Sequence, residues 1–289
     1  METPYYQVDV FSDELFGGNP LAVFLRGEDF TESQFQQVAR EMNLSETTFI
    51  FPPSAPQVDF DIRVFTPEKE IPFAGHPTIG TAYVLRKAGI IPSNQHKIRL
   101  KFKAGVIPVQ FEIDENIFMA QPPGQILQTI SNVEGISNTL GLNINNIDNN
   151  LPIQTATTGF SALLVPLVSL RSIQRIELNL SLLKDVLSEV GVDMIYPFTR
   201  EVINKKNSIH ARGFAPFIGI SEDPATGSVA GALGYYLNDK NDEEKTFLIE
   251  QGFEIKRPGI IHVEINGNNN PIRVGGKSRM VIKGYLQFE

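Results

Sequence analysis

The sequence contains no cysteine and only four histidines among its 289 residues. The absence of cysteine excludes disulfides, cysteine-ligated zinc, iron–sulfur clusters and every thiol-based mechanism. No two histidines have the His-x-x-x-His spacing that places two imidazoles on one face of a helix. A metal site would therefore need carboxylates from scattered places. The histidines are His76, His96, His210 and His262.

Long apolar runs and an excess of positive charge are also missing. The longest apolar stretch, near Ala162 to Leu170, contains Pro166 and Ser169, whereas a membrane-spanning helix needs about 20 apolar residues. The first basic residue is Arg26, so the start of the chain lacks the basic and then apolar pattern of a secretory signal. The formal net charge of −8 argues against a nucleic-acid or membrane surface. We therefore expect a cytoplasmic protein.

The length and the hydrophobic fraction of 42% allow about two domains with sizeable cores. Short apolar or alternating segments predict many strands and few helices, which indicates an α+β fold rather than alternating βαβ units. Strands are expected over residues 6–10, 21–25, 47–51, 60–65, 98–102, 107–113, 161–168, 209–214 and 260–265. Helices are expected over residues 31–42, 77–88, 178–190 and 224–237.

The segment Gln121-Pro122-Pro123-Gly124 interrupts this pattern near the middle of the chain and is the candidate linker. It divides the sequence into a half of residues 1–120 and a half of residues 121–289. Two asparagine-rich segments, 143–150 and 266–270, are expected to form exposed loops. Ala104-Gly105 is expected to close a hairpin between the strands on either side.

The two halves contain a repeated pattern. Arg63-x-Phe65-x-Pro67 is matched by Arg212-x-Phe214-x-Pro216, and each is followed by a [His/Asp]-Pro-x-x-Gly-[Thr/Ser] block. The two copies of this block run from His76 to Thr81 and from Asp223 to Ser228. Since both blocks match in the same order, we predict two related halves, each giving a strand, a loop and a helix. Halves of this kind commonly enclose a ligand between them.

In each copy of the [His/Asp]-Pro-x-x-Gly-[Thr/Ser] block, the proline predicts the start of a helix. His76 and Asp223 would then occupy the preceding cap positions. The helix after Asp223 is rich in glycine and alanine, which predicts close packing. Helix N-termini bind anions, so two of them facing one cleft would suit a small molecule that carries a carboxylate.

Several of these residues also have a simpler interpretation. Asp223 can be an ordinary helix cap, and Thr81 and Ser228 can be small packing residues. By pattern alone Glu46 is an ordinary solvated carboxylate. His76 is a poor cap, which favours a hydrogen-bonding or acid–base role. The other three histidines are expected to be structural or exposed.

The sequence resembles the PhzF-like family of phenazine-biosynthesis proteins, which have the diaminopimelate-epimerase fold. The resemblance extends over essentially the whole chain. The segments that carry it are Asp9-Val10-Phe11, Gly17 to Val23, Asn43 to Thr47, Arg63 to Pro67, Pro72 to Thr78, Glu222 to Ser228, Gln251-Gly252, Arg257-Pro258 and Val274 to Gly276.

The resemblance implies two similar halves, each a curled mixed sheet around a central helix, with a cleft between them and a last strand, near residues 280–286, that returns to the first half. It further implies a homodimer and a cofactor-free isomerisation of trans-2,3-dihydro-3-hydroxyanthranilate. Glu46 would be the general base and acid. His76 and Asp223 would hold the substrate and assist the proton shuttle. Gly75, Gly227 and Ser228 would contact the substrate carboxylate.

Other functions stay open at this point. Diaminopimelate epimerase and proline racemase use paired cysteines, and this chain has none. A PhzF-like enzyme could act on a different amino-acid-like or hydroxy-acid substrate. The chain could also be a binding protein that retains the cleft without chemistry. No coiled coil or low-complexity tail supports a structural role.

Overall fold

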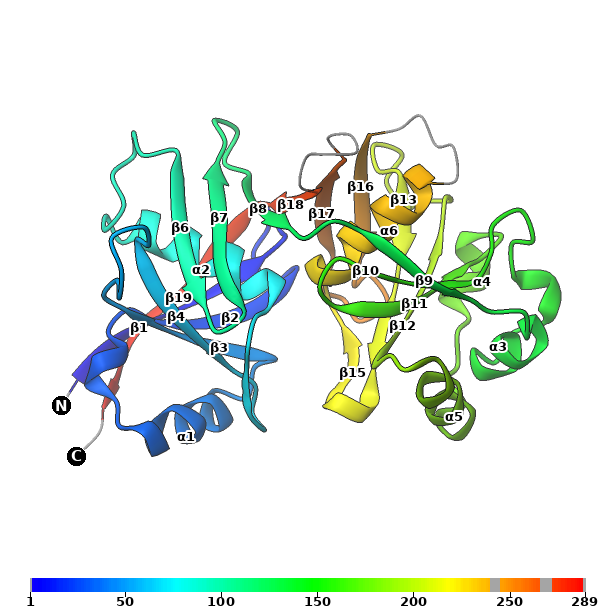
Figure 1. The fold of residues 1–289 in the computed structure, drawn as a ribbon, viewed down its shortest axis with the longest axis horizontal. Helices are drawn as coiled ribbons and strands as arrows, with labels where there is room; N and C mark the ends of the chain where they lie inside the picture. Colours follow the sequence, from blue (N-terminus) through cyan, green and yellow to red (C-terminus); the bar gives the residue numbers. More distant parts are fainter. Residues whose placement is uncertain (1, 240–244, 266–271, 288–289) are drawn as a thin grey trace. The chain divides into compact units, whose positions relative to one another are not determined.

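The chain forms a mixed α+β structure of many short strands and few helices (Figure 1). The computed structural model describes residues 2–239, 245–265 and 272–287. Contacts divide the chain into two compact units. Unit 1 is Met1–Ala120 together with Gly275–Glu289, and unit 2 is Gln121–Val274. The chain passes between the units within strands β8 (Ile117–Gln121) and β18 (Ile272–Gly276).

A mixed sheet runs through unit 1 in the order β19, β1, β2, β3, β4, β6, β7 and β8. Neighbouring strands are antiparallel except for β2 with β3 and β4 with β6, and the short β5 pairs with the end of β4. The bounds are β1 Glu2–Val10, β2 Asn19–Phe24, β3 Glu46–Phe51, β4 Phe60–Phe65, β5 Glu70–Ile71, β6 Lys97–Phe102, β7 Gly105–Phe111 and β19 Ser278–Gln287.

The helix α2 (Gly75–Lys87) is the centre of unit 1. Its residues from Gly75 to Leu85 are all buried, and it packs against β1, β2, β3, β7 and β19. At Gly80 the helix approaches the sheet so closely that a Cβ would lie 2.6 Å from a methyl group of Leu21 and 2.7 Å from one of Val10. Because α2 contacts β7 as well as β19, β1, β2 and β3, which lie toward the other end of the sheet order, the sheet curls around the helix.

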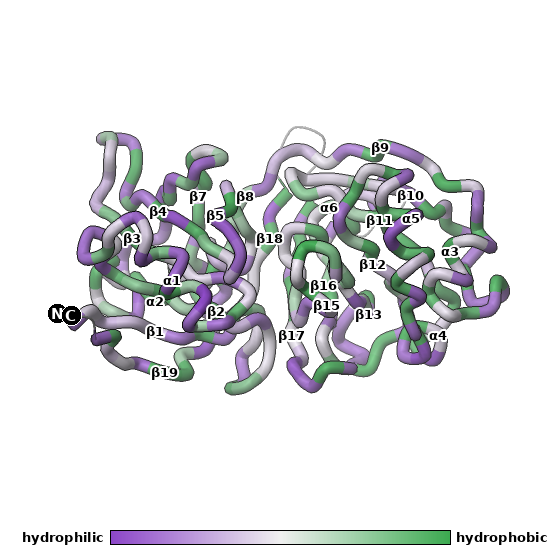
Figure 2. Tube along the Cα trace, turned by 90° about the horizontal axis from the view of Figure 1, so that it is seen from below, coloured by the Kyte–Doolittle hydropathy of each residue, from purple (hydrophilic) through white to green (hydrophobic). Residues whose placement is uncertain are grey.

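The helix α1 (Glu32–Met42) covers β3 and β4. It begins as predicted, because the side-chain oxygen of Gln34 accepts the backbone N–H of Thr31 at 2.8 Å. Most of α1 is hydrophilic (Figure 2), and only one face is buried. That face joins a cluster of aromatic residues with the sheet: Phe24, Phe30, Phe35, Phe49 and Phe65.

Unit 2 has its own mixed sheet, in the order β9, β10, β11, β12, β13, β16 and β17. The pairs β11–β12 and β13–β16 are parallel, and β14 pairs with both β12 and β15. The bounds are β9 Gln125–Thr129, β10 Gln154–Thr157, β11 Ser161–Pro166, β12 Met194–Thr199, β13 Ile209–Ala211, β14 Gly213–Ala215, β15 Ile220–Asp223, β16 Thr246–Gln251 and β17 Gly259–Glu264.

The helix α6 (Gly227–Asp239) is the centre of unit 2 and packs against β9, β10, β11, β16 and β17. Its glycines permit close contact, as predicted: a Cβ on Gly234 would lie 2.7 Å from Val263, and one on Gly231 would overlap Gln121. Three further helices bury a separate apolar cluster against the sheet. They are α3 (Val133–Thr139), α4 (Leu170–Gln174) and α5 (Leu180–Val190). Short 3₁₀ turns are η1 (Gly27–Asp29), η2 (Ile144–Asn146) and η3 (Pro216–Ile218).

The two units repeat one order of connections. In each unit, two antiparallel strands are followed by helix and by a third strand that is parallel to the second. A fourth strand pairs antiparallel with the third and leads into a short hairpin. A buried helix of 13 residues follows, and then a strand that is parallel to the fourth. In unit 1 the order is β1, β2, α1, β3, β4, β5, α2, β6, and in unit 2 it is β10, β11, α4 and α5, β12, β13 with β14, β15, α6, β16. The predicted internal repeat is therefore confirmed at the level of topology.

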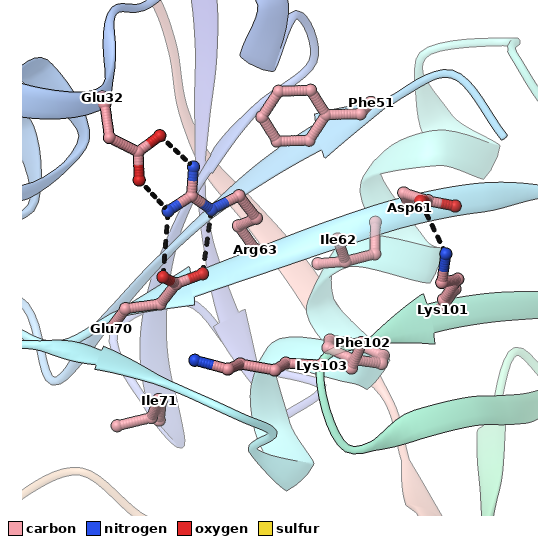
Figure 3. Close-up of a pocket in the computed structure, with 10 residues that line it drawn as sticks. All are labelled: Glu32, Phe51, Asp61, Ile62, Arg63, Glu70, Ile71, Lys101, Phe102 and Lys103. Carbon is pink, nitrogen blue, oxygen red and sulfur yellow. Dashed lines mark hydrogen bonds and ion pairs between the residues drawn. The ribbon is translucent and has the colours of Figure 1, made fainter. Parts of the chain in front are cut away.

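The repeated Arg-x-Phe pattern has a structural role in unit 1. The Arg63 guanidinium donates to Glu70 of β5 at 2.8 and 2.9 Å and to Glu32 of α1 at 2.7 and 2.6 Å (Figure 3). Its central carbon lies 5.0 Å from the centre of the Phe65 ring. One arginine thus joins β4, the hairpin strand β5 and α1.

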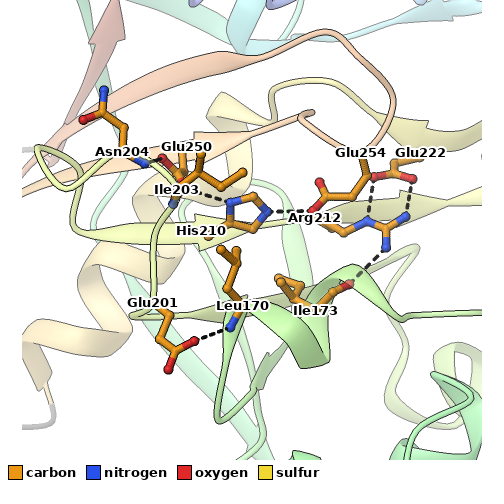
Figure 4. Close-up of polar contacts among 10 residues, drawn as sticks. All are labelled: Leu170, Ile173, Glu201, Ile203, Asn204, His210, Arg212, Glu222, Glu250 and Glu254. Atoms are coloured by element: carbon orange, nitrogen blue, oxygen red, sulfur yellow. Dashed lines mark hydrogen bonds and ion pairs between the residues drawn. The ribbon is translucent and has the colours of Figure 1, made fainter.

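Arg212 repeats this arrangement in unit 2 (Figure 4). Its guanidinium donates to Glu222 of β15 at 2.8 and 2.7 Å and lies 4.8 Å from the centre of the Phe214 ring. It also donates to the carbonyl of Ile173 at 3.0 Å. In both units the arginine therefore stacks on the phenylalanine two residues later and holds the strand that precedes the central helix.

The second repeated block is not equivalent in the two units, and the prediction that His76 and Asp223 are matched cap residues is wrong. The helix α2 begins at Gly75, so His76 lies inside its first turn. The cap position before the helix is occupied by Ala74, whose backbone is extended. Pro77 is tolerated there because the first N–H groups of a helix have no intrahelical partner.

The helix α6 begins at Gly227, not at Pro224, and Asp223 is the last residue of β15. The reason is a competing partner. Gln251 donates to the carbonyl of Asp223 at 2.7 Å and accepts the N–H of Thr226 at 3.1 Å. The backbone groups that would form a first helical turn from Asp223 are thus bonded to Gln251.

Smaller differences concern strands and loops. Ile113 was expected in a strand, yet it lies beyond β7 and is 98% exposed. The strand expected over 209–214 is divided into β13 and β14. The first asparagine-rich segment contains η2, and the second, 266–270, lies outside the described residues. Within residues 2–239, 245–265 and 272–287, no helix combines the length and hydropathy needed to cross a membrane.

We predict that Gly80→Ala destabilises the protein, although the helix propensity of alanine exceeds that of glycine by about 1 kcal/mol. The new methyl group would press on Leu21 and Val10 in a closed core, which costs about 1–3 kcal/mol. Urea denaturation measures the free energy of unfolding. Ser188→Ala, at an exposed position inside α5, provides the gain in propensity alone. Equal stability of Gly80→Ala and wild type would contradict the close packing.

Candidate functional site

Glu46 and His76 lie together inside unit 1. Oε2 of Glu46 is 3.2 Å from Nε2 of His76, and the two residues are only 7% and 6% exposed. Glu46 is the first residue of β3, and His76 is the second residue of α2. A carboxylate and an imidazole are thus held within hydrogen-bond distance at the buried N-terminus of a helix.

Two further contacts hold β3 in place, one to α2 and one to the start of β2. Thr48, on the same face of β3 as Glu46, forms a buried hydrogen bond with Thr81 of α2 at 3.0 Å. Before the strand begins, the hydroxyl of Ser45 donates to the buried side chain of Asn19 at 3.1 Å. Thr81 is therefore a hydrogen-bonding residue rather than only a small packing residue. On either side of Glu46, these contacts tie β3 to β2 and to α2.

Burial determines the charge of His76. Loss of solvation lowers the pKa of this imidazole to about 3, so His76 is neutral near pH 7. A neutral imidazole has one nitrogen that donates a hydrogen bond and one that accepts. Paired with a carboxylate, it can support a proton transfer in either direction.

Asp223 belongs to unit 2, where its side chain is 6% exposed. Its Oδ2 accepts the hydroxyl hydrogen of Thr226 at 2.6 Å. The Asp223 charge and burial both raise the pKa of Tyr196, with burial the larger cause. Asp223 therefore lies in a buried hydrogen-bonded environment at the end of β15, a few residues before α6.

The residues expected to contact a substrate carboxylate lie at the starts of the two central helices. Gly75 is the first residue of α2, and Gly227 and Ser228 are the first two of α6. The carbonyl of Gly227 accepts from the side chain of Gln121 at 2.9 Å, and that of Ser228 accepts from Thr158 at 3.2 Å. Since these carbonyls are bonded within unit 2, this turn of α6 is firmly placed.

His210 is structural, as expected from the sequence. Its two ring nitrogens lie 2.8 Å from Glu250 and 3.0 Å from Glu254 (Figure 4). Burial alone would lower the pKa of His210, but hydrogen bonds to the two carboxylates raise it above its ordinary value. His96 is exposed, and His262 lies half-buried in β17.

A cavity of about 570 Å³ opens on unit 1 at a different place (Figure 3). Its charged lining is mostly paired within the protein: Arg63 with Glu32 and Glu70, and Lys101 with Asp61. Neither Glu46 nor His76 lines it. In the described parts of the chain, no group of three or more His, Asp or Glu side chains is arranged so that it could hold a metal ion.

Sequence reasoning assigned no role to the residues of the hydrogen-bond network around Asp223. The Thr226 hydroxyl, three residues after an aspartate, follows a familiar local pattern that could have been recognised. Gln251 and Tyr196 are distant from Asp223 in sequence, so no local pattern links them to it, and Gln251 stood out only as part of a segment that carries the family resemblance. Both are fully buried and hydrogen-bonded to each other at 2.7 Å.

The fold matches solved structures along the whole chain. A PhzF-family phenazine biosynthesis protein from Bacillus anthracis superimposes with a TM-score of 0.91 at 28% identity and covers 100% of both chains. A hydroxyproline epimerase from Agrobacterium vitis gives a TM-score of 0.66 at 11% identity, covering 99% of this chain and 92% of that one. The fold is therefore of the diaminopimelate-epimerase type.

The model of the phenazine biosynthesis-like proteins, PhzC-PhzF, matches residues 8–284. Among curated proteins, antisense-enhancing sequence 1 of Schizosaccharomyces pombe is 32% identical, with 98% of both chains covered. The trans-2,3-dihydro-3-hydroxyanthranilate isomerase of Pseudomonas chlororaphis is also 32% identical, over 91% of this chain and 90% of that protein. The uncharacterized isomerase YfhB of Bacillus subtilis is 30% identical over 94% of both. The chain belongs to the PhzC-PhzF family, and by these relationships it is an isomerase.

The pKa values of the two buried histidines should be shifted in opposite directions from the ordinary value of about 6.5, downward for His76 and upward for His210. We expect the ring resonances of His76 to stay constant from pH 8 down to the acid limit of the folded state. Those of His210 should shift with a midpoint above 6.5. Carbon–proton NMR of the four histidines measures this, with His76→Gln and His210→Gln for assignment. A His76 midpoint between pH 6 and 7 would contradict the neutral, desolvated imidazole.

The low pKa of His76 in the folded protein predicts that acid destabilises the fold. The unfolded chain binds a proton at His76 below about pH 6.5, whereas the folded chain does so only near 3. Stability therefore falls as the pH drops through this window, by up to about 1.4 kcal/mol per pH unit. Urea denaturation of His76→Gln should show a shallower loss of stability below pH 6.5. An unchanged slope would contradict the assignment.

Proposed function

We propose that this isomerase moves a proton between two positions of a small carboxylic acid, with Glu46 as general base and then general acid. The observation that carries the proposal is the buried pair of Glu46 and His76, whose side-chain atoms lie 3.2 Å apart at the N-terminus of α2. Glu46 would remove the proton from one carbon and return one to another, while His76 stabilises the carboxyl group in both states.

The helix starts support the choice of an anionic substrate. Free N–H groups and the positive end of the helix dipole stabilise negative charge. We propose that Gly75 of α2 and Gly227 and Ser228 of α6 contact the substrate carboxylate. Asp223 is proposed to hold the substrate and to assist the proton transfer. No cysteine is available, so the two-base chemistry of cysteine-dependent epimerases is excluded for this chain.

The proposed substrate is trans-2,3-dihydro-3-hydroxyanthranilate. Its support is the name of the Pseudomonas chlororaphis relative, at 32% identity. An amino-acid-like or hydroxy-acid substrate is the alternative, favoured by the many relatives that are named only as isomerases. Both substrates carry the carboxylate and the acidic C–H that the proposed chemistry requires.

Incubation in deuterium oxide followed by proton NMR tests the reaction. We expect wild-type protein to consume the substrate and to incorporate deuterium, and Glu46→Gln to lower the rate about 100-fold or more because the amide cannot accept the proton. Glu41→Gln, at an exposed glutamate of α1, is the matched control and should retain the full rate. Full turnover by Glu46→Gln would refute the assigned base.

If wild-type protein leaves the first substrate unlabelled, that substrate is wrong, and exchange is then measured on amino acids and hydroxy acids. The homodimer and the cytoplasmic location stay predictions. Size-exclusion chromatography with light scattering tests the first, and a single-chain mass at all concentrations would contradict it.

A further inference from the structure

A buried hydrogen-bond network surrounds Asp223 within unit 2. Gln251 is the last residue of β16, Tyr196 lies in the middle of β12, and Thr226 immediately precedes α6. Tyr196 and Gln251 are fully buried, and Thr226 is 5% exposed. Three separate elements thus meet behind the proposed substrate-holding carboxylate.

The side-chain amide of Gln251 uses all its bonding capacity in this network. Its oxygen accepts from the Tyr196 hydroxyl at 2.7 Å and from the Thr226 N–H at 3.1 Å. Its nitrogen donates to the Asp223 carbonyl at 2.7 Å and to the Thr226 hydroxyl at 2.8 Å. An amide has two acceptor and two donor positions, so every one is filled.

The Thr226 hydroxyl transmits this arrangement to the carboxylate. It accepts from Gln251 and therefore directs its own hydrogen to Oδ2 of Asp223, 2.6 Å away. A hydroxyl has a single hydrogen, and since Thr226 accepts from the Gln251 amide, that hydrogen is the one bond it can donate to Oδ2 of Asp223. The chain of bonds from Gln251 through Thr226 thus selects one orientation of the Asp223 side chain.

The backbone around the network is held equally closely. Gly213 pairs with Asp223 between β14 and β15, and a Cβ there would lie 2.8 Å from the Thr226 hydroxyl. The neighbouring Glu222 is held by Arg212 through two hydrogen bonds. The backbone of β15 at Asp223 is therefore held by strand pairing and by Arg212, independently of the bonds to the Asp223 side chain.

We propose that Gln251 is a positioning residue that sets the Asp223 carboxylate for the reaction through Thr226, with Tyr196 fixing the orientation of the amide. This inference rests on the proposed function, since it assigns to Asp223 a role in proton transfer. A buried network with all its members satisfied is rigid, and rigidity is what a group aligned with a reacting atom requires.

Paired substitutions separate positioning from folding. Thr226→Val removes the hydroxyl at nearly constant shape, and Thr226→Ser restores it. Gln251→Glu retains the acceptors for Tyr196 and Thr226 but removes both donors. Tyr236→Phe is the matched control, because its buried hydroxyl donates to the carbonyl of Pro152 at 2.7 Å in the same unit, outside the network.

We expect Thr226→Val and Gln251→Glu to lower kcat by about tenfold to 100-fold with little change in KM, because misalignment affects the reacting geometry more than binding. Thr226→Ser and Tyr236→Phe should stay within about twofold of wild type in kcat, a range that leaves the barrier almost unchanged. Unchanged kcat in Thr226→Val, or an equal loss in Tyr236→Phe, would overturn the proposal.

A measurement without substrate distinguishes failure of this proposal from failure of the proposed function. The carboxyl carbon resonance of Asp223, assigned by its disappearance in Asp223→Asn, should move in Thr226→Val and Gln251→Glu. It should return in Thr226→Ser and stay in place in Tyr236→Phe. An unmoved resonance in Thr226→Val refutes the positioning role even where no turnover is detected. If the resonance moves as expected but wild type catalyses no exchange on any of the substrates named above, the proposed function is refuted and the control of the Asp223 side chain by Thr226 and Gln251 is not.

Discussion

Each unit is organised around one helix that is buried along most of its length. Such a helix has no solvent side, so its neighbours must surround it, and the sheet curls because strands have to reach it from several directions. The first turn of the helix is enclosed as well. Polar groups at this turn therefore lie in a desolvated setting, where each hydrogen bond and each charge has a larger effect than in water.

This enclosure explains the properties of the candidate site. His76 remains neutral because burial opposes its protonation, and Glu46 lies beside it at the start of a strand that Thr48 holds against the helix. The repeated arginine serves the same end. Arg63 and Arg212 each hold the strand that leads to a central helix, so the approach to each helix start is rigid.

Local pattern was sufficient for much of the fold. The hairpin of β6 and β7 followed from alternation on both sides of Ala104-Gly105, and the start of α1 followed from its capping box. The start of α6 could not be predicted, because Gln251, which displaces the first helical turn, is distant in sequence from Asp223. Glu46 had no local signal at all. Only the family resemblance indicated it, because a single carboxylate before a strand is common and its meeting with His76 depends on tertiary structure.

The strand β19 has a consequence for the order of folding. It pairs with β1 along nearly the whole length of that strand, yet the intervening chain includes all of unit 2. During synthesis on the ribosome, unit 2 therefore emerges completely before the sheet of unit 1 can be closed. Until then β1 has a partner on only one side, and its other edge is open to wrong pairing. A nascent chain that pauses after unit 2 would carry a complete second unit beside an incomplete first one.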